Sequence, residues 1–366
     1  MSPIPSEPRL APAPAVSPSA APAPARGEHR YDIDLLRVLA AAGVILCHAA
    51  GELMAAVDRT PAKGAAVYTT GLVADAVSRA AVPLFFAIAG WVVLCGAPPR
   101  DGAQVRRRLT RIVVPMGVWT AGYLVWARLR DEADGGVRGL ARDALFASVR
   151  PAFHLWYLYA YVPVVLLLSV AALVRSGKRP WGAGALLLGL ALAPSLLGDA
   201  GRLAGARVPA FGWQFGVYQL AYAVAGAVLL SLPGEAFAGR RRRLLWAGAV
   251  VCGWAAVAVY EHRVHFPAAY ASAVVALTAG AVLMLAGRVR VPERFRGAVA
   301  LLAGVSFGAY LVHLMVLRTL SPWVVSAGSG AVAAVGGLLA LTVVTGVLSF
   351  GAAWIWTRAG LARWLG

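Results

Sequence analysis

Residues 34–56 read DLLRVLAAAGVILCHAAGELMAA, a run that is long and apolar enough to cross a membrane as one helix. Arg37 and His48 interrupt this run. In a helix, their spacing puts the two side chains about 16 Å apart along the axis and about 20° apart in azimuth, on one face. A charged group at membrane depth costs about 3 kcal/mol on insertion scales, so such residues are functional candidates. Asp34 and Glu52 lie within same-face contact range of the pair.

The composition extends this membrane setting to the whole chain. Of the 366 residues, 60% are hydrophobic and 14% are charged, and the mean hydropathy is +0.71. A soluble globular chain of this length does not need so much apolar surface, and no alternating pattern of a membrane barrel is present. We therefore predict an all-α membrane protein, a polytopic bundle of about ten transmembrane helices. The expected spans are residues 34–55, 76–97, 112–129, 153–174, 182–199, 213–232, 244–261, 268–287, 300–320 and 330–356.

The basic residues predict the orientation of the bundle. They gather in the loops after the second, fourth, sixth and eighth spans, and the positive-inside rule places those loops and both termini in the cytoplasm. The net charge of +18 then reflects topology and attraction to anionic lipid, so no nucleic-acid partner is expected. The residues concerned include Arg100, Arg106, Arg107, Arg108, Arg111, Arg175, Lys178, Arg179, Arg240, Arg241, Arg242, Arg243, Arg288, Arg290, Arg294 and Arg296.

Two regions of different composition define the domains. Residues 1–30 are rich in Pro and Ala and have no apolar core, which predicts a disordered cytoplasmic tail rather than a signal peptide. Residues 31–366 form the expected membrane domain. The cysteines all fall inside spans, and their spacing suggests neither a disulfide framework nor a metal site. The bias toward Ala, Arg and Gly is typical of GC-rich genomes and favours a bacterial source.

Further polar residues can be placed by depth. His154 opens the fourth span on the outer side. Ser306, Tyr310 and His313 share one face of the ninth span, since they are spaced by four and three residues. Arg108 and Arg111 lie on one face at the cytoplasmic start of the third span.

Each of these residues also has a structural interpretation. Arg37 and His48 could form an interhelical polar clamp, His154 could belong to an interfacial aromatic belt, and His313 could be a packed, hydrogen-bonded histidine.

Other charged residues have simpler interpretations. Arg106 and Arg107 are expected to be membrane anchors, and Asp75 and Arg79 are expected to form a helix-end ion pair. Glu261 is expected to be solvated in an outer loop.

Five motifs together resemble the acyltransferase 3 family of integral membrane O-acyltransferases. The resemblance covers roughly residues 30–360, in the family's order. One departure is Ala89, which stands before Gly90 where the family usually carries a serine. The motifs are RYDIDLLRVLAAAGVILCH (30–48), VPLFFAIAGWVV (82–93), RLTRIVVP (108–115), HLWYLYAYVP (154–163) and SFGAYLVH (306–313).

The resemblance implies transfer of an acyl group, commonly acetyl, from cytoplasmic acyl-CoA to a hydroxyl of a cell-surface glycan, a lipid or a metabolite. Arg108 and Arg111 suit the phosphates of the donor. His48, with Arg37 and Glu52, is the candidate catalytic group, and it acts either as a base or as the carrier of the acyl group.

On the acceptor side, the residues expected to line the site or to stabilise the oxyanion are His154, Tyr310, His313 and Ser306. Acyl-CoA is a co-substrate, and no bound cofactor is expected. The implied location is the cell membrane, as a multi-pass protein. The alternatives are a proton-coupled transporter or flippase of the cell envelope, or acylation of a secondary metabolite such as a macrolide.

Overall fold

The computed structural model describes residues 29–130, 136–205 and 208–366, and these contain helices and no strand. The predicted tail of residues 1–30 lies almost wholly outside the described residues. Tyr31–Gly366 forms one compact unit. Its α-helices are α1 (Tyr31–Ala56), α2 (Ala65–Ser78), α3 (Ala81–Trp91), α4 (Gly102–Leu129), α5 (Val137–Phe146), α6 (Trp156–Arg175), α7 (Trp181–Ala204), α8 (Val217–Leu229), α9 (Arg240–Val264), α10 (Ala273–Ala286), α11 (Glu293–Val324), α12 (Ala331–Arg358) and α13 (Ala362–Leu365).

In the described part of the chain, eight helical runs are long and apolar enough to cross a membrane. The prediction of an all-α fold is therefore confirmed, and the described residues hold eight candidate membrane spans where ten were expected. Two of the ten expected spans, residues 213–232 and 268–287, contain only the 13-residue α8 and the 14-residue α10. The second expected span is the later part of a longer run, Ala65–Gly96, in which α2 and α3 follow each other.

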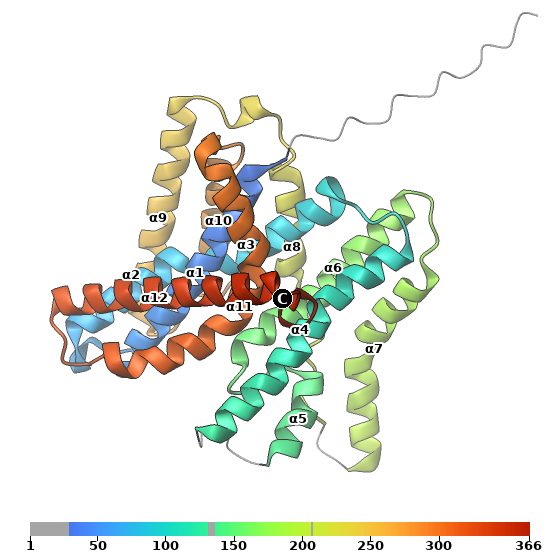
Figure 1. Ribbon diagram of the computed structural model, residues 1–366, viewed down its shortest axis with the longest axis horizontal. Coiled ribbons are helices and arrows are strands. Elements are labelled where there is room, and N and C mark those ends of the chain that lie inside the picture. Colours follow the sequence, from blue (N-terminus) through green and yellow to red (C-terminus); the bar gives the residue numbers. More distant parts are fainter. Residues whose placement is uncertain (1–28, 131–135, 206–207) are drawn as a thin grey trace, which may run out of the picture. The chain divides into compact units, whose positions relative to one another are not determined.

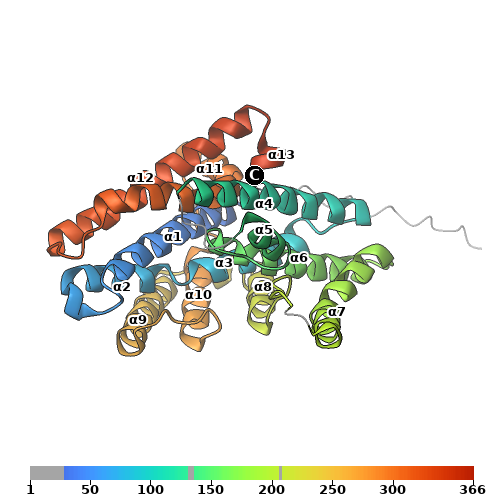
Figure 2. The same ribbon diagram turned by 90° about the horizontal axis from the view of Figure 1, so that it is seen from below.

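The helix α1 lies in the middle of the bundle (Figure 1) and packs against α2, α3, α11 and α12. Figure 2 shows α1 and α6 between two groups of helices, with α4, α11 and α12 on one side and α7, α8, α9 and α10 on the other. Leu36, Ala40 and Ala49 on α1 are fully buried. Because α1 is covered on several sides, both ends of its polar face are held against other helices.

Close backbone contact joins α3 to α8. A Cβ atom at Gly90 would lie 1.8 Å from the carbonyl oxygen of Ala223, and one at Gly226 would lie 2.0 Å from that of Ala87. Small residues permit this approach between membrane helices. The contact fixes α3, whose residues Phe85 and Ala89 form part of the functional cavity described below.

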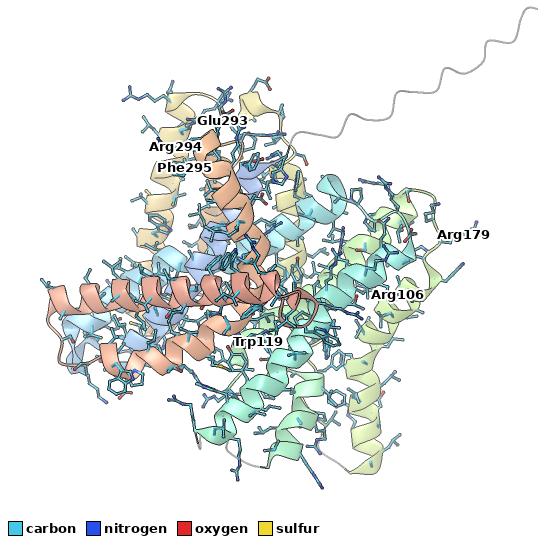
Figure 3. The ribbon with its side chains drawn as sticks, viewed as in Figure 1. Arg106, Trp119, Arg179, Glu293, Arg294 and Phe295 are labelled. Atoms are coloured by element: carbon cyan, nitrogen blue, oxygen red, sulfur yellow. The ribbon has the colours of Figure 1, made fainter. Side chains whose placement is uncertain are left out.

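Hydrogen bonds also tie helix ends together. Arg175 at the end of α6 donates to the carbonyl of Leu94 (3.1 Å), and the backbone amide of Arg288 donates to Asp32 at the start of α1 (2.7 Å). The loops that follow the second and fourth expected spans are therefore neighbours. Trp119 on α4 (Figure 3) donates to the carbonyl of Leu365 (3.1 Å), which docks α13 against α4.

Candidate active site

A cavity of about 610 Å³ opens between α1, α3, α4, α6 and α11. Four arginines line it, and three of them come from α4 because residues 107, 108 and 111 share one helix face. Aromatic and aliphatic side chains form the rest of the wall, together with Gln104 and Ser306. This size is typical of small-molecule sites. The four arginines are Arg37, Arg107, Arg108 and Arg111.

The arginines make this cavity suited to an anion. Arg108 donates from Nη2 to the carbonyl of Ala97 (2.6 Å), whereas its Nη1 is buried and has no hydrogen-bond partner among the described residues. Arg37 lies 3.5 Å from the carboxylate of Asp34. Guanidinium groups bind phosphate oxygens through charge-assisted, often bidentate, hydrogen bonds. Arg107 was expected to be a membrane anchor but lines the cavity instead. It therefore adds a third arginine to Arg108 and Arg111, the pair predicted from the sequence to bind the donor.

Tyrosines form part of the cavity wall. Tyr157, Tyr161 and Tyr310 line it, and the ring centroids of Tyr157 and Tyr310 are 5.8 Å apart. Tyr310 donates from its hydroxyl to the carbonyl of His154 (2.7 Å). Ser306, expected on the acceptor side, lines the same cavity as the arginines and donates to the carbonyl of Ala303 (2.8 Å).

Three imidazoles meet directly behind Tyr310. The ring centroid of His313 lies 5.2 Å from that of His48 and 5.3 Å from that of His154, and His48 and His154 are 6.4 Å apart. The rings come from α1, from α11 and from the 3-10 turn Phe153–Leu155, which precedes α6. The structure thus brings together the three histidines that the sequence singled out, and Tyr310 is 5.6 Å from His154 and 5.7 Å from His313.

The hydrogen bonds of the three rings differ. His313 directs Nδ1 at the carbonyl of Tyr310, so Nδ1 carries the proton and Nε2 keeps its lone pair. Within the described residues, this Nε2 and both ring nitrogens of His154 are buried without a partner. His48 is only half-buried. The cluster thus holds imidazole nitrogens that make no hydrogen bond with the described residues.

Glu52 lies one turn beyond His48 but is held elsewhere. Its carboxylate accepts a hydrogen bond from Ser321 on α11 (3.0 Å), and no hydrogen bond between Glu52 and His48 occurs in the described residues. The neighbour of His48 on this side is Phe153, at 5.5 Å between ring centroids, and Arg318 lies 5.4 Å above the Phe153 ring. The sequence did not single out Arg318 or Phe153, because both lie outside the five motifs. Phe153 precedes the motif of residues 154–163, and Arg318 follows the motif of residues 306–313.

Tyr123, also missed, reaches the cluster from α4. It is fully buried, and its ring centroid is 5.0 Å from that of His154. Its hydroxyl donates to the carbonyl of Leu311 (3.0 Å) and accepts from the amide of Met315 (3.1 Å). In a regular helix those two backbone groups bond to each other. Tyr123 therefore bonds to both of these backbone groups, at the turn of α11 that carries His313.

A charged cluster lies on the other side of α1. Arg79 pairs with Asp75 and lies 3.4 Å from Glu261, and Asp75 accepts from the thiol of Cys47 (3.4 Å). The expected Asp75–Arg79 pair is confirmed. Glu261, expected to be solvated, is 3% exposed and accepts from the amide of Ala268 (2.8 Å). The expectation failed because α9 continues to Val264, so Glu261 lies in the helix rather than in a loop.

Comparison with known proteins assigns the family. A family model described as an acyltransferase domain, acyltransferase 3, matches residues 30–357, nearly the whole chain. Neither the curated proteins nor the solved structures compared with the chain include a match. The resemblance carried by the five sequence motifs is confirmed, and the chain belongs to the acyltransferase 3 family.

Proposed function

We propose that this membrane acyltransferase moves an acyl group, acetyl in the simplest case, from cytoplasmic acyl-CoA to a hydroxyl of a cell-surface glycan or a related acceptor. The observation that carries the proposal is one cavity that is lined by four arginines and by Tyr310, with three imidazoles behind Tyr310. The arginines suit the phosphates of the donor. The imidazoles suit the proton transfer that an alcohol needs before it attacks a thioester.

In direct transfer, His48 accepts the proton of the acceptor hydroxyl. The hydroxyl oxygen attacks the thioester carbonyl, the C–O bond of the ester forms, and the C–S bond breaks. The sulfur leaves as thiolate and takes up the proton, so the products are an ester and the free thiol of CoA. Tyr310 and His313 lie near enough to the cluster to support the proton transfer or the oxyanion.

In the two-step route, a ring nitrogen of His48 attacks the thioester first and carries the acyl group. The CoA thiol leaves before the acceptor arrives, and the hydroxyl then attacks the acyl-imidazole. Both routes use the same residues. They differ in whether CoA is released when no acceptor is present, which rapid mixing of purified protein with acetyl-CoA measures as a burst of free thiol.

The decisive experiment measures turnover and transport together. Purified protein in liposomes receives labelled acetyl-CoA and an envelope fraction of the source cell. Release of free CoA thiol with label in an ester supports the proposal. Movement of envelope solutes across the liposome membrane without any CoA release contradicts it and supports the transporter alternative. If Arg37 and His48 only form a structural polar clamp, neither CoA release nor solute movement occurs, and the proposal is likewise contradicted.

A further inference from the structure

The arginine-lined cavity does not reach the imidazoles. The three histidines are absent from its described lining, and Tyr310 lies between the cavity and two of them. Tyr157 lines the cavity beside Tyr310, at 5.8 Å between ring centroids. Tyr310 faces the cavity on one side and the rings of His154 and His313 on the other. An acyl group that travels from the donor past Tyr310 toward His48 therefore moves beside the Tyr157 ring.

The two rings are held in different ways. Tyr310 is fixed through its hydroxyl, which donates to the backbone of His154 (2.7 Å). The hydroxyl of Tyr157 makes no hydrogen bond with the described residues, although the side chain is only 7% exposed. Aromatic packing alone holds this ring, against Phe86 at 4.9 Å, Tyr161 at 5.2 Å and Tyr310 at 5.8 Å between centroids.

We propose that Tyr157 sets the length of the acyl chain that this enzyme transfers. This inference rests on the proposed function. A short acyl group passes beside the Tyr157 ring with little rearrangement. A long chain needs the volume that the ring occupies, and moving the ring disturbs several packed aromatic neighbours, which a close-packed core resists.

Tyr157 takes no part in the bond changes. The thioester C–S bond breaks and the ester C–O bond forms as in the proposed function, and the proton still goes to the CoA thiol. The residue determines specificity, so its removal should alter which donors are used rather than whether transfer occurs. Its position on α6 provides a matched control in Tyr161, which is one turn away and lines the same cavity. Among the described residues, the ring of Tyr161 contacts Phe86 and Tyr157 but neither Tyr310 nor a histidine.

The test compares acetyl-CoA, butyryl-CoA and octanoyl-CoA as donors for purified protein in lipid nanodiscs, with an envelope fraction as acceptor. Wild type should use acetyl-CoA and reject octanoyl-CoA. Tyr157→Ala should raise the octanoyl-to-acetyl ratio of kcat/KM by about 100-fold, the scale on which pocket size discriminates between chains. Tyr157→Phe keeps the ring and should keep the wild-type ratio. Tyr161→Ala should raise the KM of every donor without changing the ratio.

The outcomes separate this inference from the proposed function. If wild type releases CoA from no donor, the proposed function fails. If wild type turns over acetyl-CoA and Tyr157→Ala keeps its chain-length profile, the proposed function stands and the role of Tyr157 is refuted. An equal change of the octanoyl-to-acetyl ratio in Tyr157→Ala and Tyr161→Ala also refutes the role of Tyr157, since the cavity as a whole would then determine the acyl-chain length. Tyr157→Leu, which keeps a large apolar side chain, carries the same test if the alanine variant does not fold.

Discussion

His48 is partly exposed, whereas His154 and His313 are 2% and 0% exposed. It is therefore the least buried of the three clustered imidazoles, and it lies on the same helix as Arg37 of the cavity. His48→Ala should lower acyl transfer by at least about 10²–10⁴-fold, the usual contribution of a general base. Labelled ester formation measures this loss. An unchanged elution profile and melting temperature in detergent check that the variant folds, and near-normal activity would refute the assignment.

At the donor site, the prediction concerns Arg108. Its unpartnered Nη1 should bind a phosphate oxygen, and a hydrogen bond between charged groups contributes about 1.5–3 kcal/mol. Arg108→Gln should therefore raise the KM for acetyl-CoA by about tenfold or more and leave kcat nearly unchanged, because the contact is made in both ground and transition states.

Arg106 is the control for that change. It lies two residues away on α4 (Figure 3), is exposed, and is absent from the described lining of the cavity. Arg106→Gln removes the same charge and should leave the KM close to wild type. Equal KM values in the two variants would mean that the general positive charge, rather than the cavity, attracts the donor.

At the residue scale, the sequence singles out positions where an ionisable side chain is costly. Arg37, His48 and His313 stood out because ionisable groups in apolar helices are rare, and the structure places each of them at the cavity or in the imidazole cluster. Tyr157 and Tyr123 did not stand out, because an aromatic residue in an apolar helix is ordinary. Only the tertiary contacts of these rings distinguish them from core residues.

At the scale of the element, Tyr123 links α4 to α11. Tyr123→Phe removes the hydroxyl that bonds to the backbone of Leu311 and Met315, so the turn between them loses its tie to α4 and His313 should move. We expect kcat to fall by about tenfold or more, because small displacements of a catalytic group reduce rate strongly, with little change in KM or melting temperature.

Tyr159→Phe is the matched control for that prediction. Tyr159 is also buried and also donates to a backbone carbonyl, that of Ala144, but its partner ring is Trp213 rather than a histidine. This variant should keep wild-type kcat. A similar fall in kcat for both tyrosines would indicate general loosening of the bundle, and would contradict a positioning role for Tyr123.

The charged cluster joins α2 to α9 and gives a prediction on stability. The side chains of Arg79, Asp75 and Glu261 are 8%, 8% and 3% exposed. Arg79→Met removes the ion-pair partner of two buried carboxylates, and breaking a buried pair in this way costs about 3–5 kcal/mol. The melting temperature in detergent should fall clearly. Arg202→Met breaks an ion pair that is largely exposed and should have almost no effect; equal losses would contradict the prediction.

For the whole molecule, hydropathy predicted the class of fold but not all of its elements. Long apolar runs predicted α1, α6 and α12 well, because membrane spans require such runs. Apolar character alone does not fix where a helix begins, so α8 and α10 are shorter than the spans expected around them. The cavity could not be predicted, since it arises where five helices meet.

The central claim is that acyl-CoA and the acceptor meet His48 from opposite faces of the membrane. Sealed vesicles from source cells, prepared in both orientations and given external labelled acetyl-CoA, test it directly. Inside-out vesicles should incorporate label into their internal acceptor, intact right-side-out vesicles should not, and the His48→Ala protein should give no label in either. Equal labelling of intact right-side-out vesicles, or His48-independent labelling, would contradict the account.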